Sequence, residues 1–126
     1  MLLGSLSKAL SDFEHNGRLN NFPWDIQNII FLKNNIKHIW NIEDAQILKD
    51  FISKYETNVI PVITKIKRSF VHNDSNTNII LNSKSEIKGI IDFGDMTRSL
   101  TVCESAVCIS YIDQNSENLL EDIKEF

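Results

Sequence analysis

The sequence is poor in the residues that cross-link or break small folds, and it contains no long hydrophobic run. Its 126 residues include two cysteines, two prolines and four glycines. Nowhere do about 18 apolar residues follow one another, and the first residues are too polar for a signal peptide. We therefore expect a cytoplasmic protein that does not cross a membrane. Cys103 and Cys108 lie five positions apart in an expected helix, which favours buried free thiols over a disulfide or a zinc site.

The charge balance is mildly acidic. There are 13 basic and 17 acidic side chains, which give a formal net charge of -4. A nucleic-acid partner is not expected, because no basic stripe is present to displace counterions from phosphates. A nucleotide partner is compatible with this balance, since it needs only a bound metal or local positive charge. Hydrophobic residues make up 42% of the chain, as in ordinary globular domains, and its length indicates a single domain over residues 1–126.

The first half of the sequence predicts helices. Apolar residues recur at helical spacing from Leu3 to Phe13, and a second helical stretch runs from Trp24 to Trp40. Asn41 is expected to cap a further helix, because asparagine is favoured at the N-cap and acidic residues follow in the first turn. Pro61 predicts that this helix breaks near Val59, since proline cannot continue a helix interior.

The hydrophobic period changes in the second half. The segments 70–71, 78–82 and 87–91 each have the length and composition of a strand, and a turn joins the last two. Each leg of this hairpin has about five residues, or roughly 17 Å of strand. The return leg then brings Asp92 close to the loop that carries Asp74. We predict an α+β fold, mostly helical, in which a small antiparallel hairpin carries an acidic edge.

Two converging carboxylates are what metal-assisted phosphoryl transfer requires. One orients and deprotonates a substrate hydroxyl, and the other holds the magnesium that neutralises nucleotide phosphates. Gly94 follows Asp92 by two residues and permits a sharp turn there. The alternative is structural: Asp92 caps the following turn and Asp95 merely faces water.

The amino-acid sequences of two segments resemble those of a known family. Residues 71–81, Val-His-Asn-Asp-Ser-Asn-Thr-Asn-Ile-Ile-Leu, resemble the His-x-Asp-x-x-x-x-Asn catalytic loop of protein kinases and their antibiotic and choline kinase relatives. Residues 90–96, Ile-Ile-Asp-Phe-Gly-Asp-Met, resemble the metal-binding segment that follows it. Together with Thr-Val-Cys-Glu at 101–104 and Trp-Asp at 24–25, they are most similar to the hydroxylysine kinase-like branch of the aminoglycoside phosphotransferase superfamily.

This resemblance implies a kinase-like C-terminal lobe that uses Mg²⁺, with ATP or GTP as phosphoryl donor, and a small amino-alcohol acceptor such as hydroxylysine. The glycine-rich loop and strand lysine of the N-terminal nucleotide-clamping lobe have no counterpart here. Two hypotheses follow. The chain is either a fragment or separately encoded half of an active kinase, inactive in isolation, or a truncated, non-catalytic binding or interaction module.

The resemblance also assigns roles to individual residues. Asp74 would accept the proton of the acceptor hydroxyl, Asp92 and Asn78 would bind the metal, and His72 would support the loop backbone. The loop between Asp74 and Asn78 is one residue shorter than the family pattern. Asn78 therefore reaches the metal from a tightened loop, or Asn76 replaces it, or the second metal site is lost.

Four further residues have two interpretations each. Asp95 and Glu104 either contact a protonated amine of the acceptor or are structural, for example as helix caps. Ile80 and Ile91 either form the floor beneath the nucleotide base or belong to the core, which is the default for apolar residues in strands.

Overall fold

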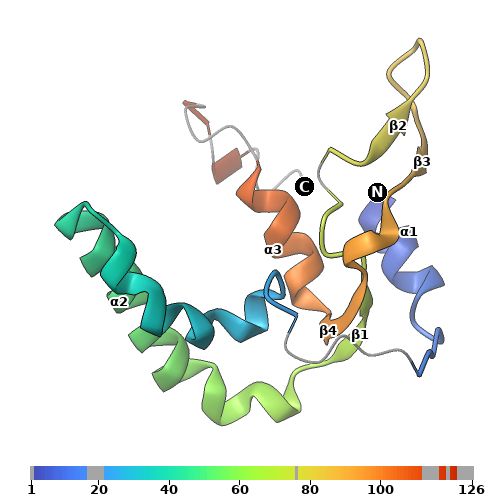
Figure 1. The fold of residues 1–126 in the computed structure, drawn as a ribbon. Coiled ribbons are helices and arrows are strands. Elements are labelled where there is room, and N and C mark those ends of the chain that lie inside the picture. The colour runs from blue at the N-terminus through green and yellow to red at the C-terminus, as the bar shows by residue number, and fades with distance from the viewer. Residues whose placement is uncertain (1, 17–21, 76, 112–116, 119, 122–126) are drawn as a thin grey trace.

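The computed structural model describes residues 2–16, 22–75, 77–111, 117, 118, 120 and 121 (Figure 1). Within these residues the fold is α+β and mostly helical, with two small antiparallel sheets, as the sequence predicts. The α-helices are α1 (Leu2–Ala9), α2 (Ile42–Asn58) and α3 (Val102–Ser110). The 3-10 helices are η1 (Ile26–His38), η2 (Ile60–Lys65) and η3 (Phe93–Asp95). The strands are β1 (Arg68–Val71), β2 (Ile79–Leu81), β3 (Ile87–Ile90) and β4 (Thr97–Leu100).

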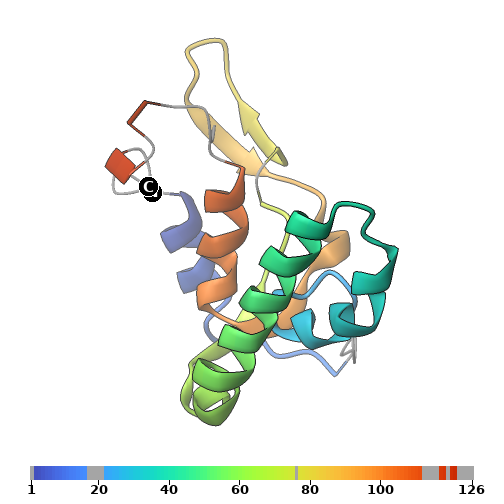
Figure 2. The same ribbon diagram turned by 90° about the vertical axis from the view of Figure 1, so that its left-hand side faces the viewer.

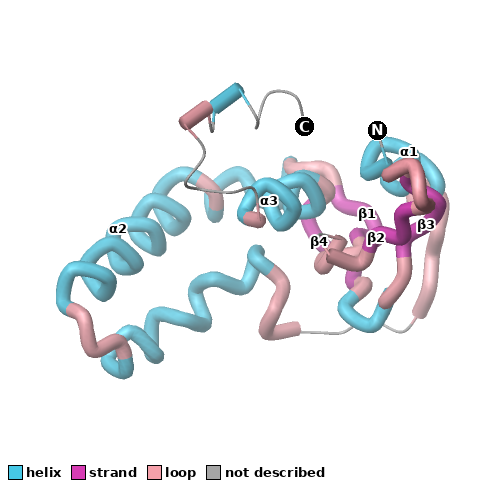
Figure 3. Tube along the Cα trace, turned by 90° about the horizontal axis from the view of Figure 1, so that it is seen from above, coloured by secondary structure: helices cyan, strands magenta, loops and turns pink. Residues whose placement is uncertain are grey.

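The helices η1 and α2 form an arm that extends away from the sheets (Figures 1 and 3). Asp25 caps η1 by accepting a hydrogen bond from the backbone N–H of Gln27 at 3.1 Å. Asn41 caps α2 in the same way, with Glu43 N–H as donor at 2.9 Å, so the predicted cap is confirmed. The stretch expected as a helix between residues 24 and 40 is the 3-10 helix η1, with non-helical dihedral angles at Asn28.

The predicted break after α2 is also confirmed. The helix ends at Asn58, Val59 is its C-cap, and Pro61 occupies the first turn of η2. Proline is tolerated there because the first turn of a helix needs no partner for its backbone nitrogen. The first helix is shorter than its apolar pattern predicts, because α1 ends at Ala9 and not near Phe13.

The strands form two separate pairs. β2 and β3 make the predicted hairpin, in which Ile79 pairs with Ile90 and a register irregularity falls between Ile80 and Leu81. The hairpin projects beyond α3 in both side views (Figures 1 and 2). β4 was not predicted; it pairs with β1, with Ser69 opposite Ser99. This second pair joins the ends of the hairpin to the rest of the fold.

The core lies where β1, β4, α2 and α3 meet. Its buried apolar residues include Ile52, Phe70, Val71, Leu100 and Cys103. Both cysteines are buried and free, as expected. No helix among the described residues is long and apolar enough to cross a membrane. The same region also buries polar side chains, three of which belong to the loop that follows β1. The buried polar residues are Asp25, Ser69, His72, Asn73, Ser75, Thr97, Ser99 and Glu104. Buried polar groups need partners, so the contacts of this loop decide its geometry.

Candidate functional site

The ring of His72 joins the loop after β1 to the end of β3. His72 is fully buried, and its Nε2 lies 2.8 Å from the carbonyl oxygen of Ile91. Its Nδ1 accepts a hydrogen bond from the backbone N–H of Asp74 at 3.3 Å. A carbonyl only accepts and a backbone N–H only donates, so the two contacts require the tautomer with its proton on Nε2. One neutral imidazole thus links both motifs.

Asn73 makes the reversal between His72 and Asp74. Its φ of 67° lies in the left-handed region, which asparagine tolerates better than most residues. The side chain donates from Nδ2 to the carbonyl oxygen of Trp24 at 3.3 Å, so the segment before η1 also holds the loop. Its other atom, Oδ1, is buried and has no hydrogen-bond partner among the described residues.

Asn78 folds back onto Asp74. Its Nδ2 donates to the backbone carbonyl of Asp74 at 2.8 Å and to the carboxylate oxygen Oδ2 at 3.0 Å. The backbone carbonyl of Asn78 also accepts from Ile91 N–H at 2.9 Å. Both side-chain contacts use the Nδ2 atom of Asn78. Asn76, the other candidate, lies outside the described residues.

Asp92 makes the turn at the end of the hairpin. It has a φ of 61° and is exposed, and its Oδ1 accepts a hydrogen bond from Gly94 N–H at 3.3 Å, which caps η3. Gly94 was expected to allow the turn through its own backbone freedom, but it does not have a positive φ. A Cβ atom at this position would lie 3.2 Å from the Asp92 carboxylate, so glycine leaves room for that carboxylate instead.

The carboxylate and amide oxygens near the ends of the hairpin are of the kind that Mg²⁺ prefers as ligands. Asp74 lies two residues after His72 and Asp92 lies one residue after Ile91, so the hydrogen bond between His72 and Ile91 joins the two segments that carry these acids. No group of three or more His, Cys, Asp or Glu residues forms a metal cluster in the described part of the chain. Two carboxylates and one amide are nevertheless compatible with Mg²⁺, which usually retains several water ligands.

Glu104 lies inside the protein, not at the surface of this edge. It is 2% exposed, and its carboxylate accepts hydrogen bonds from His72 N–H and from the Ser75 hydroxyl. It is therefore not accessible to an acceptor amine, and it does not cap α3 either. Asp95 is half-buried in η3.

Ile80, in β2, and Ile91, which directly follows β3, are not core residues. Ile80 is 46% exposed and Ile91 is 49% exposed, contrary to the default expectation for apolar strand residues. About half of each side chain is therefore accessible to solvent. Their exposure is what a surface that receives a planar base would need.

Two buried contacts of the site were missed from the sequence. Ser75 binds Glu104, and Ser99 donates to the Asp25 carboxylate at 2.6 Å. The partners lie 29 and 74 residues apart, and no local pattern connects such positions. Of these residues, only Asp25 has a role that the sequence could have indicated, because an acidic residue before a helical stretch is a typical N-cap.

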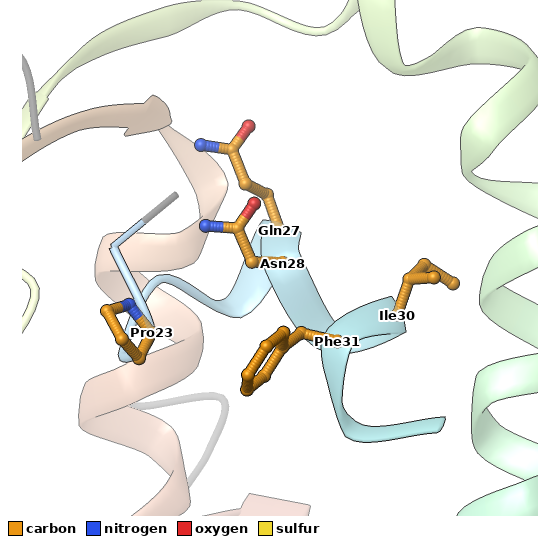
Figure 4. A pocket seen from close by; sticks show the side chains of 5 residues that line it. All are labelled: Pro23, Gln27, Asn28, Ile30 and Phe31. Atoms are coloured by element: carbon orange, nitrogen blue, oxygen red, sulfur yellow. The ribbon is translucent and has the colours of Figure 1, made fainter. Parts of the chain in front are cut away.

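A cavity of about 310 Å³ lies beside η1, and its lining includes Pro23, Gln27, Asn28, Ile30 and Phe31 (Figure 4). The wall is mostly apolar. Neither Asp74 nor Asp92 lines it, so the cavity is separate from the acidic edge.

Comparison with known proteins identifies relatives of one kind. The chain is 31% identical to hydroxylysine kinase of Danio rerio over 121 aligned positions, which cover 88% of this chain and 34% of the relative. It is 28% identical to hydroxylysine kinase of Mus musculus over 133 aligned positions, covering 95% of this chain and 35% of the relative. The chain thus spans about a third of the length of these curated relatives. No family model and no solved structure matches it.

Proposed function

Because this chain is similar to hydroxylysine kinases over most of its length, we propose that it is the phosphotransferase lobe of a small-molecule kinase. In this proposal the γ-phosphate of ATP or GTP passes to a hydroxyl group of an amino alcohol such as hydroxylysine. The observation that supports it best is the His72 ring, which joins the loop of Asp74 to the segment of Asp92. Both motifs are needed for phosphoryl transfer, and a structural hydrogen bond at this point holds them together.

Asp74 is the proposed base. The acceptor oxygen attacks the γ-phosphorus, the bond from that phosphorus to the nucleoside diphosphate breaks, and the hydroxyl proton moves to the Asp74 carboxylate. Asn78 donates to the same carboxylate and fixes its orientation. Asp92 and the Oδ1 atom of Asn78 would hold Mg²⁺, which supplies charge neutralisation at the phosphates when bound.

A non-catalytic binding module is the second candidate. The observation that favours it is the distribution of glycine. The four glycines stand at positions 4, 17, 89 and 94, so none of them forms a glycine-rich phosphate loop. Positioning and charge neutralisation supply most of the catalysis in phosphoryl transfer. Residues 1–126, tested on their own, are therefore not expected to transfer phosphate.

A complementation assay distinguishes the two candidate functions. The chain is incubated with Mg²⁺, labelled ATP or GTP, a panel of amino alcohols that includes hydroxylysine, and the part of Danio rerio hydroxylysine kinase that lies outside the matched region. The kinase proposal predicts transfer only in the mixture, lost in Asp74→Asn and kept in Asp12→Asn, a variant of an exposed acid away from the loop. Binding of nucleotide without transfer in any mixture supports the binding module instead.

A further inference from the structure

Glu104, in the first turn of α3, contacts the loop of residues 72–75 on both sides of Asp74. Its Oε2 accepts a hydrogen bond from the backbone N–H of His72, and its Oε1 accepts one from the Ser75 hydroxyl at 2.7 Å. Both donors are fully buried and Glu104 is 2% exposed. Hydrogen bonds to a carboxylate are among the strong ones in proteins, particularly away from water. The loop is therefore attached to α3 at two points.

Cys108, one turn further along α3, completes this contact. Its Sγ lies 3.0 Å from the Ser75 oxygen. Burial raises the pKa of the Cys108 thiol above its ordinary value of 9.0, so the thiol keeps its proton at neutral pH and can donate. The hydrogen bonds then run in one direction, from the thiol to the Ser75 hydroxyl and from that hydroxyl to Glu104. Both the donor and an acceptor site of Ser75 are used.

The hydrogen bonds to Glu104 fix the position of the loop of residues 72–75 and also stabilise the fold. The backbone reverses at Asn73 through a left-handed conformation, so the loop cannot be held by a regular strand ladder there. Asp74 lies between the two attached residues, and its own N–H contacts the His72 ring at 3.3 Å. A shift of either attachment point would therefore move the Asp74 carboxylate relative to Asp92.

We propose that Glu104 and Ser75 are positioning residues, which hold Asp74 at the distance from Asp92 that phosphoryl transfer requires. The inference rests on the proposed function, because the role of Asp74 as base is part of it. Neither residue touches a reacting group; both act through the loop backbone.

The chain offers a matched pair of variants to test this. Ser75→Ala and Ser99→Ala each remove a fully buried hydroxyl that donates to a buried carboxylate, at 2.7 Å and 2.6 Å respectively. Their effects on global stability should be similar. Ser75 belongs to the loop, whereas Ser99 lies in β4 and binds Asp25, which makes no direct hydrogen bond to the described residues 72–75. Amide hydrogen exchange at residues 72–74, measured under native conditions by NMR, therefore distinguishes a local change in the loop from a loss of global stability.

In Ser75→Ala the His72 and Asp74 amides should exchange about tenfold faster than the loss of global stability alone would cause. In Ser99→Ala the exchange of these amides should change only as much as global stability does. Glu104→Gln, which keeps the side-chain volume, should give the same local increase as Ser75→Ala. Equal exchange in the two serine variants, after correction for global stability, would overturn the proposal.

Metal binding is a second measurement, and it tests whether the position of the loop affects the proposed metal site. Mn²⁺, used as a paramagnetic probe for Mg²⁺, should bind several-fold more weakly to Ser75→Ala than to wild type, with no change in Ser99→Ala. Equal Mn²⁺ affinity in both variants counts against a positioning role even if exchange differs. If wild type itself binds no Mn²⁺, the proposed metal site fails, and the exchange comparison still decides whether α3 positions the loop.

Discussion

Replacing His72 tests how the two motifs are held together. The ring is fully buried, donates to the Ile91 carbonyl at 2.8 Å, accepts from Asp74 N–H at 3.3 Å and contacts the Phe93 ring with centroids 4.7 Å apart. His72→Ala removes the ring and leaves both polar groups without their partner. An unpaired buried polar group costs about 1–3 kcal/mol, and the cavity adds to this. We expect a loss of roughly 3–5 kcal/mol in the free energy of unfolding.

Two conservative variants divide this loss between the two nitrogens. In His72→Gln the side-chain NH₂ can occupy the place of Nε2 and donate to Ile91, whereas in His72→Asn the shorter amide can only accept from Asp74. Because the Nε2 contact joins the two motifs and is the shorter of the two, His72→Asn should be the less stable by about 1 kcal/mol. Urea unfolding at constant m-value measures each difference.

A decrease of less than about 1 kcal/mol in the free energy of unfolding of His72→Ala would refute the reasoning, because removal of a buried ring with two hydrogen bonds should cost more than that. Equal stability of the Asn and Gln variants would show that the contact with Ile91 is not the link between the motifs.

Three further predictions concern local features. Asn41→Ala should lower the free energy of unfolding by about 1 kcal/mol through loss of the α2 cap, and urea unfolding checks it. Gly94→Ala places a Cβ 3.2 Å from the Asp92 carboxylate, so it should displace that carboxylate and weaken Mn²⁺ binding with little change in stability; unchanged binding argues against a metal role there. Burial raises the pKa of Cys103 and Cys108 above 9.0, so their contribution to stability is full below about pH 9 and is lost as pH rises through the folded-state pKa values. Urea midpoints between pH 7 and pH 10.5 should be flat and then fall.

The features that the sequence predicted correctly are local ones. The cap at Asn41, the break before Pro61 and the hairpin of β2 and β3 each depend on residues within a few positions of one another. Capping, proline geometry and strand period act over this range, so a single sequence contains the necessary information.

The features that escaped prediction depend on distant residues. β4 is recognisable only through its pairing with β1, which lies about 30 positions earlier. The contact of Ser75 with Glu104 and that of Ser99 with Asp25 leave no periodic pattern, because each joins single polar side chains from separate elements. The conformation of Gly94 also differed from expectation, since the left-handed turn is made by Asp92.

Magnesium binding at Asp92 is the most direct test of the account. Asp92→Asn is a suitable variant, because asparagine tolerates the left-handed φ of 61° and its Oδ1 can still cap η3. At a Mg²⁺ concentration ten times the Kd, a single site adds about 1.4 kcal/mol of stability, or on the order of 5 °C in Tm. The account predicts that thermal unfolding of wild type shifts upward by this amount and that the shift disappears in Asp92→Asn. No shift in wild type, or an equal shift in both proteins, would contradict it.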